Sequence, residues 1–267
     1  MMLTLSPEQA DFAGVLHDFL AAGKRELGEL GVGEVTDPAD LVVVFEELGH
    51  HAVPGPLIES LAVLPMLGAG PGSVAFPPHV PHAVEADRYF LVEGDTLREA
   101  VATAELSSVD PERRLVELIP GPVIATGVPA ARAFDLGVLT CSAQLLGLGR
   151  AMLEMTTAHT LTRTQFGRPI GSFQAVKHHL ANVLIGLELA RPLVFGAAVT
   201  MTTRDVSAAK VAASDAAWNA ARTALQVHGA IGYTAEHELG RFLLQTRALR
   251  TAWGSPSMHR ARVLEAL

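Results

Sequence analysis

The strongest constraint on the fold is the apolar pattern that follows Phe173. Apolar residues recur there every three or four positions, a spacing that places them on one face of a helix; they are Val176, Leu180, Val183, Leu184, Leu187, Ala190 and Val194. The following segment 205–228 is rich in alanine, which favours helix and allows close contact between helices. The sequence therefore predicts a bundle of long helices over the C-terminal half of the chain.

The N-terminal part also shows helix signals. Ser6-Pro7, with Gln9 three residues after the serine, is typical of an N-cap with a capping box. Asp37-Pro38 indicates a second helix start, and we expect Gly49 to end that helix. A third helical stretch is expected over Leu57–Leu67.

The middle of the chain reads as a small β region. The apolar segments Tyr89–Glu93, Leu115–Ile119 and Val123–Ala125 are typical of strands, and Pro120-Gly121-Pro122 predicts a turn between the last two. The expected fold is mostly α with a small central β domain. Its parts are an N-terminal helical domain (1–70), a truncated β domain (71–135) and a C-terminal helical-bundle domain (136–267).

Composition excludes several classes of protein. Hydrophobic residues make up 49% of the chain and charged residues 18%, which excludes intrinsic disorder. The formal net charge of -8 argues against nucleic-acid binding. The single cysteine, Cys141, excludes an intrachain disulfide and a multi-cysteine zinc site. No apolar run reaches the roughly 18 residues that span a bilayer, and the N-terminus has no signal-peptide pattern, so we expect a cytoplasmic protein with no membrane partner.

Common ligand motifs do not explain the chain. His50-His51 and His178-His179 are adjacent pairs, and because neighbours on a helix point in different directions, neither pair is a chelate; we expect no metal. Gly147-Leu148-Gly149 lacks a third glycine and a preceding strand, so a dinucleotide-binding loop is not expected.

Two segments carry a specific resemblance. Arg163–His178 (RTQFGRPIGSFQAVKH) and Gln226–Glu236 (QVHGAIGYTAE) strongly resemble the flavin-dependent acyl-CoA dehydrogenase family. Asp110–Leu115 resembles the family's middle domain more weakly, as Phe45–Gly49 resembles its N-terminal helix. The resemblance covers almost the whole chain, is most specific over residues 140–260, and implies FAD as cofactor and a C-terminal four-helix bundle.

The resemblance also implies cofactor contacts. In the family, these two segments reach the FAD of a neighbouring subunit, and the guanidinium of Arg163 offers a planar donor fork suited to a pyrophosphate. For Val176 and Leu180, ordinary core packing is the simpler interpretation. The residues that the resemblance assigns to FAD are Arg163, Gln165, Phe166, Gln174, Gln226, Gly229 and Ala230.

The chain departs from the family where the chemistry needs a base. The family reaction removes an α-proton from an acyl-CoA while a hydride leaves to the flavin, and a carboxylate accepts the proton. The usual glutamate position, just before a glycine, is Trp253 here. The alternative position used by some members is Gly137, and Asp135 nearby would lie on another side of the helix. We therefore predict no catalytic residue in this chain.

A second departure concerns the flavin ring. Residues 71–135 contain neither the glycine-rich Thr/Ser loop nor the Trp-x-Thr/Ser strand with which the family holds that ring. The combined pattern resembles the degenerate subunit of α2β2 acyl-CoA dehydrogenases of actinobacterial steroid degradation. That resemblance implies a larger partner subunit that supplies the base, the ring site and the pocket for an acyl- or steroid-CoA of the cholesterol type. Two alternatives stay open, a non-enzymatic helical scaffold and a self-sufficient homotetramer with an unrecognised base.

Overall fold

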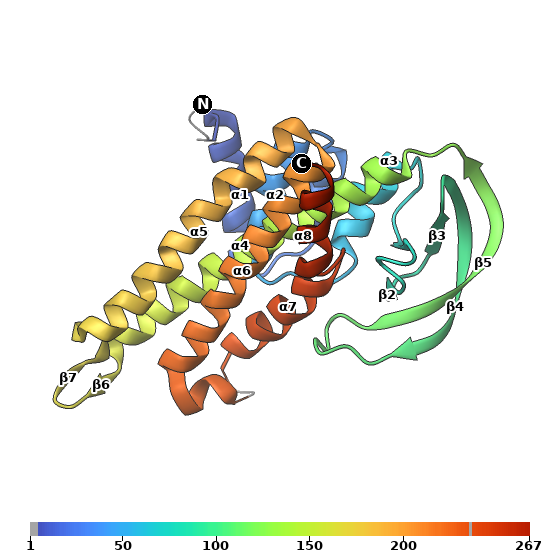
Figure 1. Ribbon diagram of the computed structural model, residues 1–267. Helices are drawn as coiled ribbons and strands as arrows, with labels where there is room; N and C mark the ends of the chain where they lie inside the picture. Colours follow the sequence, from blue (N-terminus) through green and yellow to red (C-terminus); the bar gives the residue numbers. More distant parts are fainter. Residues whose placement is uncertain (1–4, 235–236) are drawn as a thin grey trace.

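The computed structural model describes residues 5–234 and 237–267, and the protein is mostly helical with one small mixed sheet (Figure 1). Helices precede and follow the sheet along the chain, as predicted. The elements before the sheet are α1 (Pro7–Ala21), 3-10 turns at Leu27–Leu30 and Val32–Glu34, α2 (Pro38–His50), a π-helical turn at Glu59–Val63 and α3 (Leu64–Met66).

The two predicted helix starts are confirmed. Ser6 Oγ accepts a hydrogen bond from Gln9 N at 3.2 Å, and Gln9 Oε1 accepts one from Ser6 N at 3.1 Å, which completes the capping box. Asp37 caps α2 by accepting from Ala39 N at 2.8 Å.

The sheet contains a strand where the sequence predicted a turn. Pro120-Gly121-Pro122 lies inside one strand, β5, so the expected turn is wrong. Opposite it, Ala100 pairs with Pro120 and Arg98 with Val123, so β5 carries an extra residue, a β-bulge that accommodates prolines without N–H donors. The strand order is β1-β3-β4-β5-β2, with only β1 and β3 parallel among the described pairs; the strands are β1 (Ser73–Ala75), β2 (Ala83–Val84), β3 (Tyr89–Glu93), β4 (Thr96–Leu106) and β5 (Leu115–Thr126).

Long helices form the body of the molecule. The predicted apolar face of α5 is buried at Val183, Leu187, Ala190 and Val194, whereas Leu184 is 48% exposed on another side. The buried alanines of α6 pack against α4 and α5, as its composition predicted. The elements after the sheet are α4 (Ala130–Thr162), a hairpin of β6 (Thr164–Gln165) and β7 (Arg168–Pro169), a 3-10 turn at Ile170–Ser172, α5 (Gln174–Thr200), α6 (Thr203–His228), a 3-10 turn at Gly229–Tyr233, α7 (Leu239–Thr251) and α8 (Pro256–Glu265).

Two glycines bring α2 and α4 into contact. A Cβ on Gly49 would lie 2.0 Å from the carbonyl oxygen of Gln144, and one on Gly147 would lie 1.9 Å from that of Glu46. Gly49 therefore does not end α2, which continues to His50; it allows the backbones to approach. Gly147 does the same from the middle of α4, a place where it cannot form a dinucleotide-binding loop.

Two helices contradict the expectation that no segment could span a bilayer. By length and composition alone, α4 and α5 are long and apolar enough to cross a membrane. The expectation was wrong because scattered Ser, Thr and Gly residues interrupt an apolar run without making the helix polar. In α4, 89% of the most apolar window is buried inside the protein, as in the core helix of a bundle, and in α5 the share is 39%.

Candidate functional site

The predicted cofactor residues gather at one end of the bundle. Arg163 follows the last residue of α4, and Gln174 opens α5 beyond the β6–β7 hairpin. Gln226 lies in the last turn of α6. Figure 1 shows the hairpin and the C-terminal end of α6 at the same end of the molecule. The stacked rings of His159 on α4 and His228 on α6, with centroids 4.3 Å apart, join the two helix ends.

These side chains face outward. Arg163, Gln165, Gln174 and Gln226 are exposed. Phe166 is 92% exposed and has a left-handed φ of 53°, so the hairpin holds an apolar ring out of the protein. The last two residues of the predicted set follow α6: Gly229, half-buried with a φ of 62°, and Ala230, exposed.

The same end of the bundle carries positive charge. Burial, together with neighbouring His228, His237 and Arg163, lowers the pKa of His159, so the charge comes from the arginines and not from this ring. The guanidinium of Arg168 lies 4.1 Å from the ring centroid of Phe173, which fixes the base of the hairpin. A surface with Arg163 and Arg168 exposed beside backbone turns suits an anionic ligand such as a pyrophosphate.

The two positions that the resemblance assigns to the catalytic base meet in space. A Cβ on Gly137 of α4 would lie 2.4 Å from Cζ3 of Trp253, which follows α7. The Trp253 side chain is fully buried, and the rings of Phe76 and Phe134 lie 5.7 and 5.9 Å from it. An indole thus fills the space that a side chain at Gly137 would need.

The backbone around Trp253 is held in an unusual conformation. Trp253 has a φ of 56° and Gly254 a φ of 96°. His259 Nε2 donates to the carbonyl oxygen of Trp253 at 2.8 Å, which leaves Nδ1 to accept from Ser207 Oγ at 3.1 Å. Burial lowers the pKa of His259 to about 4, so this imidazole is neutral at pH 7. The loop is therefore fixed by a buried hydrogen bond.

Asp135 is not available as a base. Its carboxylate accepts from Arg262 Nη2 at 2.7 Å and from Thr203 Oγ1 at 2.8 Å, and its side chain is 7% exposed. This agrees with the expectation that it lies on another side of α4 than Gly137.

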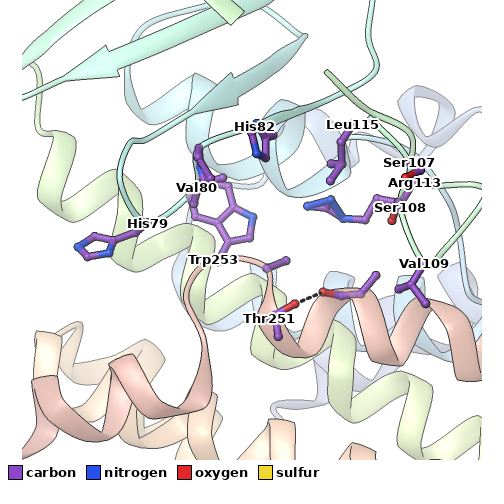
Figure 2. A pocket seen from close by; sticks show the side chains of 13 residues that line it. His79, Val80, His82, Ser107, Ser108, Val109, Arg113, Leu115, Thr251 and Trp253 are labelled. Atoms are coloured by element: carbon purple, nitrogen blue, oxygen red, sulfur yellow. Dashed lines mark hydrogen bonds between the residues drawn. The ribbon is translucent and has the colours of Figure 1, made fainter. Parts of the chain in front are cut away.

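A cavity of about 300 Å³ lies beside Trp253, between the sheet and α7. Figure 2 shows its walls: the loop with His79 and His82, the β4–β5 connection with Arg113, and the end of α7 with Thr251. No carboxylate is among the lining residues, which offer imidazole, hydroxyl and guanidinium groups. His79 and His82 could not be identified from the sequence, because a lone histidine in a loop carries no spacing signal.

Comparisons with known proteins identify relatives of this chain. Residues 127–267 match the family described as "Acyl-CoA dehydrogenase, C-terminal domain". Acyl-CoA dehydrogenase IpdE2 of Mycolicibacterium smegmatis is 33% identical over 259 residues, which cover 91% of this chain and 81% of that protein.

Solved structures share the fold at low identity. Butyryl-CoA dehydrogenase from Megasphaera elsdenii superposes with a TM-score of 0.83 at 19% identity, covering 100% of this chain and 99% of that one. A chain of the ChsE4-ChsE5 complex from Mycobacterium tuberculosis superposes with a TM-score of 0.81 at 21% identity, covering 99% of this chain and 98% of that one. A chain of the Tcur3481-Tcur3483 steroid ACAD superposes with a TM-score of 0.78 at 20% identity, covering 98% of each chain. The match of residues 127–267 to the family and the 33% identity with IpdE2 over 91% of this chain show that the chain belongs to the acyl-CoA dehydrogenase family.

Proposed function

We propose that this chain is the non-catalytic subunit of a heteromeric, FAD-dependent acyl-CoA dehydrogenase that introduces an α,β double bond into a CoA thioester. The partner, a larger acyl-CoA dehydrogenase chain, supplies the base, the flavin-ring site and the substrate pocket. This chain supplies contacts to the partner's FAD across the interface, and the isolated chain is inactive. The proposed assembly is an α2β2 heterotetramer in the cytoplasm.

One observation carries the proposal: the indole of Trp253 fills the place of the base. Desaturation next to a thioester needs a group that accepts the α-proton, and a positioned carboxylate does this in the family. Here both positions for that carboxylate are lost together, since Gly137 has no side chain and leaves the room that Trp253 occupies. A single replaced residue would be weaker support than two replacements that fit each other.

The residues present fit one half of FAD and not the other. FAD is the cofactor of the family, and when bound it accepts the hydride. The exposed Arg163, Gln174 and Gln226 at the bundle end offer donors for phosphate and adenosine groups. The cavity beside Trp253 is small for a flavin ring with its substrate, and the sheet residues carry neither family motif for that ring. We therefore assign Arg163, Gln165, Phe166, Gln174, Gln226, Gly229 and Ala230 to the FAD of the partner.

The exposed face of α5 supports a partner subunit. Ile185, Leu189 and Leu193 follow one another at four-residue spacing and are 55%, 68% and 48% exposed. A stripe of this kind on a long helix is typical of a surface that another chain covers. Two of the fold neighbours are named as pairs of proteins, ChsE4-ChsE5 and Tcur3481-Tcur3483. The second is named as a steroid ACAD, which favours a steroid CoA thioester as the substrate class; within that class we propose one of the cholesterol type.

The test replaces the indole with a carboxylate in the assembled complex. The chain is co-expressed with full-length acyl-CoA dehydrogenase chains from the same organism, and the complex that co-purifies is assayed for dehydrogenation of CoA thioesters. Trp253→Glu should leave turnover per complex unchanged or lower, because a base without a flavin ring cannot complete the oxidation. Trp253→Phe is the control for altered packing. Turnover that doubles in Trp253→Glu, or dehydrogenation by the isolated wild-type chain, would contradict the proposal.

The scaffold alternative predicts a different result. A helical interaction module without a role in the enzyme would give a colourless complex, or none, with every acyl-CoA dehydrogenase partner.

A further inference from the structure

A histidine-rich cluster lies away from the bundle end and the Trp253 cavity. It joins α1 to the C-terminal end of α2 through His17, Glu47, His50 and His51, whose possible ligand atoms all lie within 4.8 Å of one another. His17 Nδ1 is 2.9 Å from Glu47 Oε2 and 3.2 Å from His51 Nε2. Nothing in the acyl-CoA dehydrogenase reaction uses these residues.

The spacing explains why the sequence analysis expected no metal. His50 and His51 point in different directions as neighbours on a helix, but Glu47 lies three residues before one and four before the other, on the same side of α2. The missing member is His17, which the packing of α1 against α2 brings in from 30 residues earlier than Glu47. Local spacing alone cannot show such a contact.

The distances suit a small divalent transition metal. A tetrahedral zinc ion with bonds of about 2.0–2.1 Å keeps its ligand atoms about 3.3 Å apart. Two of the separations between ligand atoms, 2.9 and 3.2 Å, need shifts of a few tenths of an ångström to reach that value, and the longest, up to 4.8 Å, needs a side-chain movement of about 1.5 Å. Three imidazoles and one carboxylate are a donor set that zinc, copper and nickel prefer over calcium or magnesium.

A second feature points to a bound cation. The His50 side chain is 90% buried, and its Nε2 contacts Glu154 Oε2 at 2.9 Å. Its other ring nitrogen, Nδ1, is buried and has no hydrogen-bond partner among the described residues. A carboxylate on one ring nitrogen with the other nitrogen free is the arrangement that orients histidines toward metals.

Charged side chains of both signs surround the cluster. Arg150 Nη1 lies 3.5 Å from Glu47 Oε1, but it also lies 2.8 Å from Glu46 Oε1, so two carboxylates share it. Glu47 Oε2 thus stays on the side of His17, and Glu154 adds a further negative charge beside His50.

We propose that His17, Glu47, His50 and His51 form a structural binding site for one zinc-class divalent transition metal ion per chain. Four protein ligands leave no open position, so the ion ties α1 to α2 and does not activate a substrate. The side chain of His17 is 42% exposed, which gives the ion a path from solvent.

The test uses the full chain, alone or in its complex, after dialysis against a chelator. Zinc chloride is titrated by calorimetry, and bound zinc is counted by elemental analysis. We expect one zinc per chain and a higher thermal unfolding midpoint with zinc than without it. Loading with cobalt(II) should give the strong visible absorption of a tetrahedral site.

Three variants separate a built site from chance binding. His17→Gln removes a ligand from a half-exposed position and should remove the zinc-dependent rise in the unfolding midpoint. Glu154→Gln changes a residue that is 61% exposed and should weaken zinc binding about ten- to hundredfold. The double variant His178→Gln/His179→Gln, on the exposed start of α5, should bind zinc like wild type.

The proposal would be overturned by a chain that binds no zinc at micromolar concentration. Equal zinc affinity in wild type and His17→Gln would overturn it as well, as would equal losses in His17→Gln and the His178/His179 control. In each case the cluster is a set of hydrogen-bonded side chains and no metal site.

Discussion

Arg163 is the residue on which the proposed contact with FAD depends most. Its guanidinium is exposed at the end of α4, where a partner's pyrophosphate could accept two parallel hydrogen bonds. A charge-assisted contact of this kind contributes about 1.5–3 kcal/mol, so Arg163→Ala should weaken FAD binding to the complex about ten- to hundredfold. Arg163→Lys should restore part of the FAD affinity, because lysine keeps the positive charge but lacks the paired N–H donors of the guanidinium. The measurement is FAD dissociation followed by flavin fluorescence.

Arg132→Ala is the matched control for that experiment, since Arg132 is exposed near the other end of α4. Its FAD affinity should equal that of wild type. If Arg163→Ala also kept the wild-type affinity, Arg163 would be an ordinary surface arginine without a role in cofactor binding.

His259 gives the fold a pH dependence. In the unfolded chain a histidine titrates near pH 6.5, whereas in the folded protein burial lowers the pKa of His259 to about 4. The unfolded state therefore binds more protons between these values, so this contribution to stability is complete above pH 6.5 and is lost as the pH falls toward 4. The free energy of unfolding that His259 contributes above pH 6.5, and that is lost by pH 4, is about 3 kcal/mol.

Chemical denaturation at several pH values measures this effect. His259→Gln should be less stable than wild type at pH 7.5 and should lose less stability on acidification to pH 5. Parallel curves for the two proteins would show that His259 does not titrate on unfolding.

At the scale of elements, the contact between α2 and α4 is the tightest constraint on the fold. Gly147→Ala would place a methyl group 1.9 Å from the carbonyl oxygen of Glu46, a backbone atom that cannot turn away. We expect a loss of about 1–3 kcal/mol or more in the free energy of unfolding. Gly196→Ala is the matched control, since Gly196 lies inside α5 with no atom within 4 Å of an added Cβ. That variant should be stabilised by about 0.4–1 kcal/mol.

Denaturant unfolding of the two variants tests this account of the glycines. Equal stabilities of Gly147→Ala and Gly196→Ala would mean that α2 and α4 can separate at little cost.

The elements that the sequence predicted well depend on local signals. The capping box at Ser6, the N-cap Asp37 and the apolar face around Leu187 each follow from residues close together in the chain. The errors depend on distant contacts. Pro120-Gly121-Pro122 stays in a strand because β4 pairs with β5 on both sides of the bulge, and Gly49 stays helical because α4 lies against it.

At the scale of the whole molecule, the sites too depend on contacts between residues that are distant in the chain. The family pattern predicted Trp253 and Gly137 as two separate departures from the family. Only the fold shows that the Trp253 indole fills the space that a side chain at Gly137 would need. His17 could not be associated with His50 and His51, because their contact needs two helices to pack. The FAD contacts at Arg163 and Gln226 stay predictions, since both side chains face solvent.

At the scale of the assembly, the proposed function divides one active centre between two chains. In the proposed complex, the partner holds the flavin ring and the base, and this chain closes the other half of the FAD site. Such a complex contains one FAD for each pair of unlike chains.

The ratio of flavin to protein in the purified complex tests this claim most directly. Flavin absorbance after denaturation, divided by the amount of each chain from amino-acid analysis, should give two FAD molecules per α2β2 tetramer. The isolated chain should be colourless. Four FAD molecules per tetramer, or a flavin-loaded homotetramer of this chain alone, would show that the chain builds a complete flavin site and would contradict the division of labour.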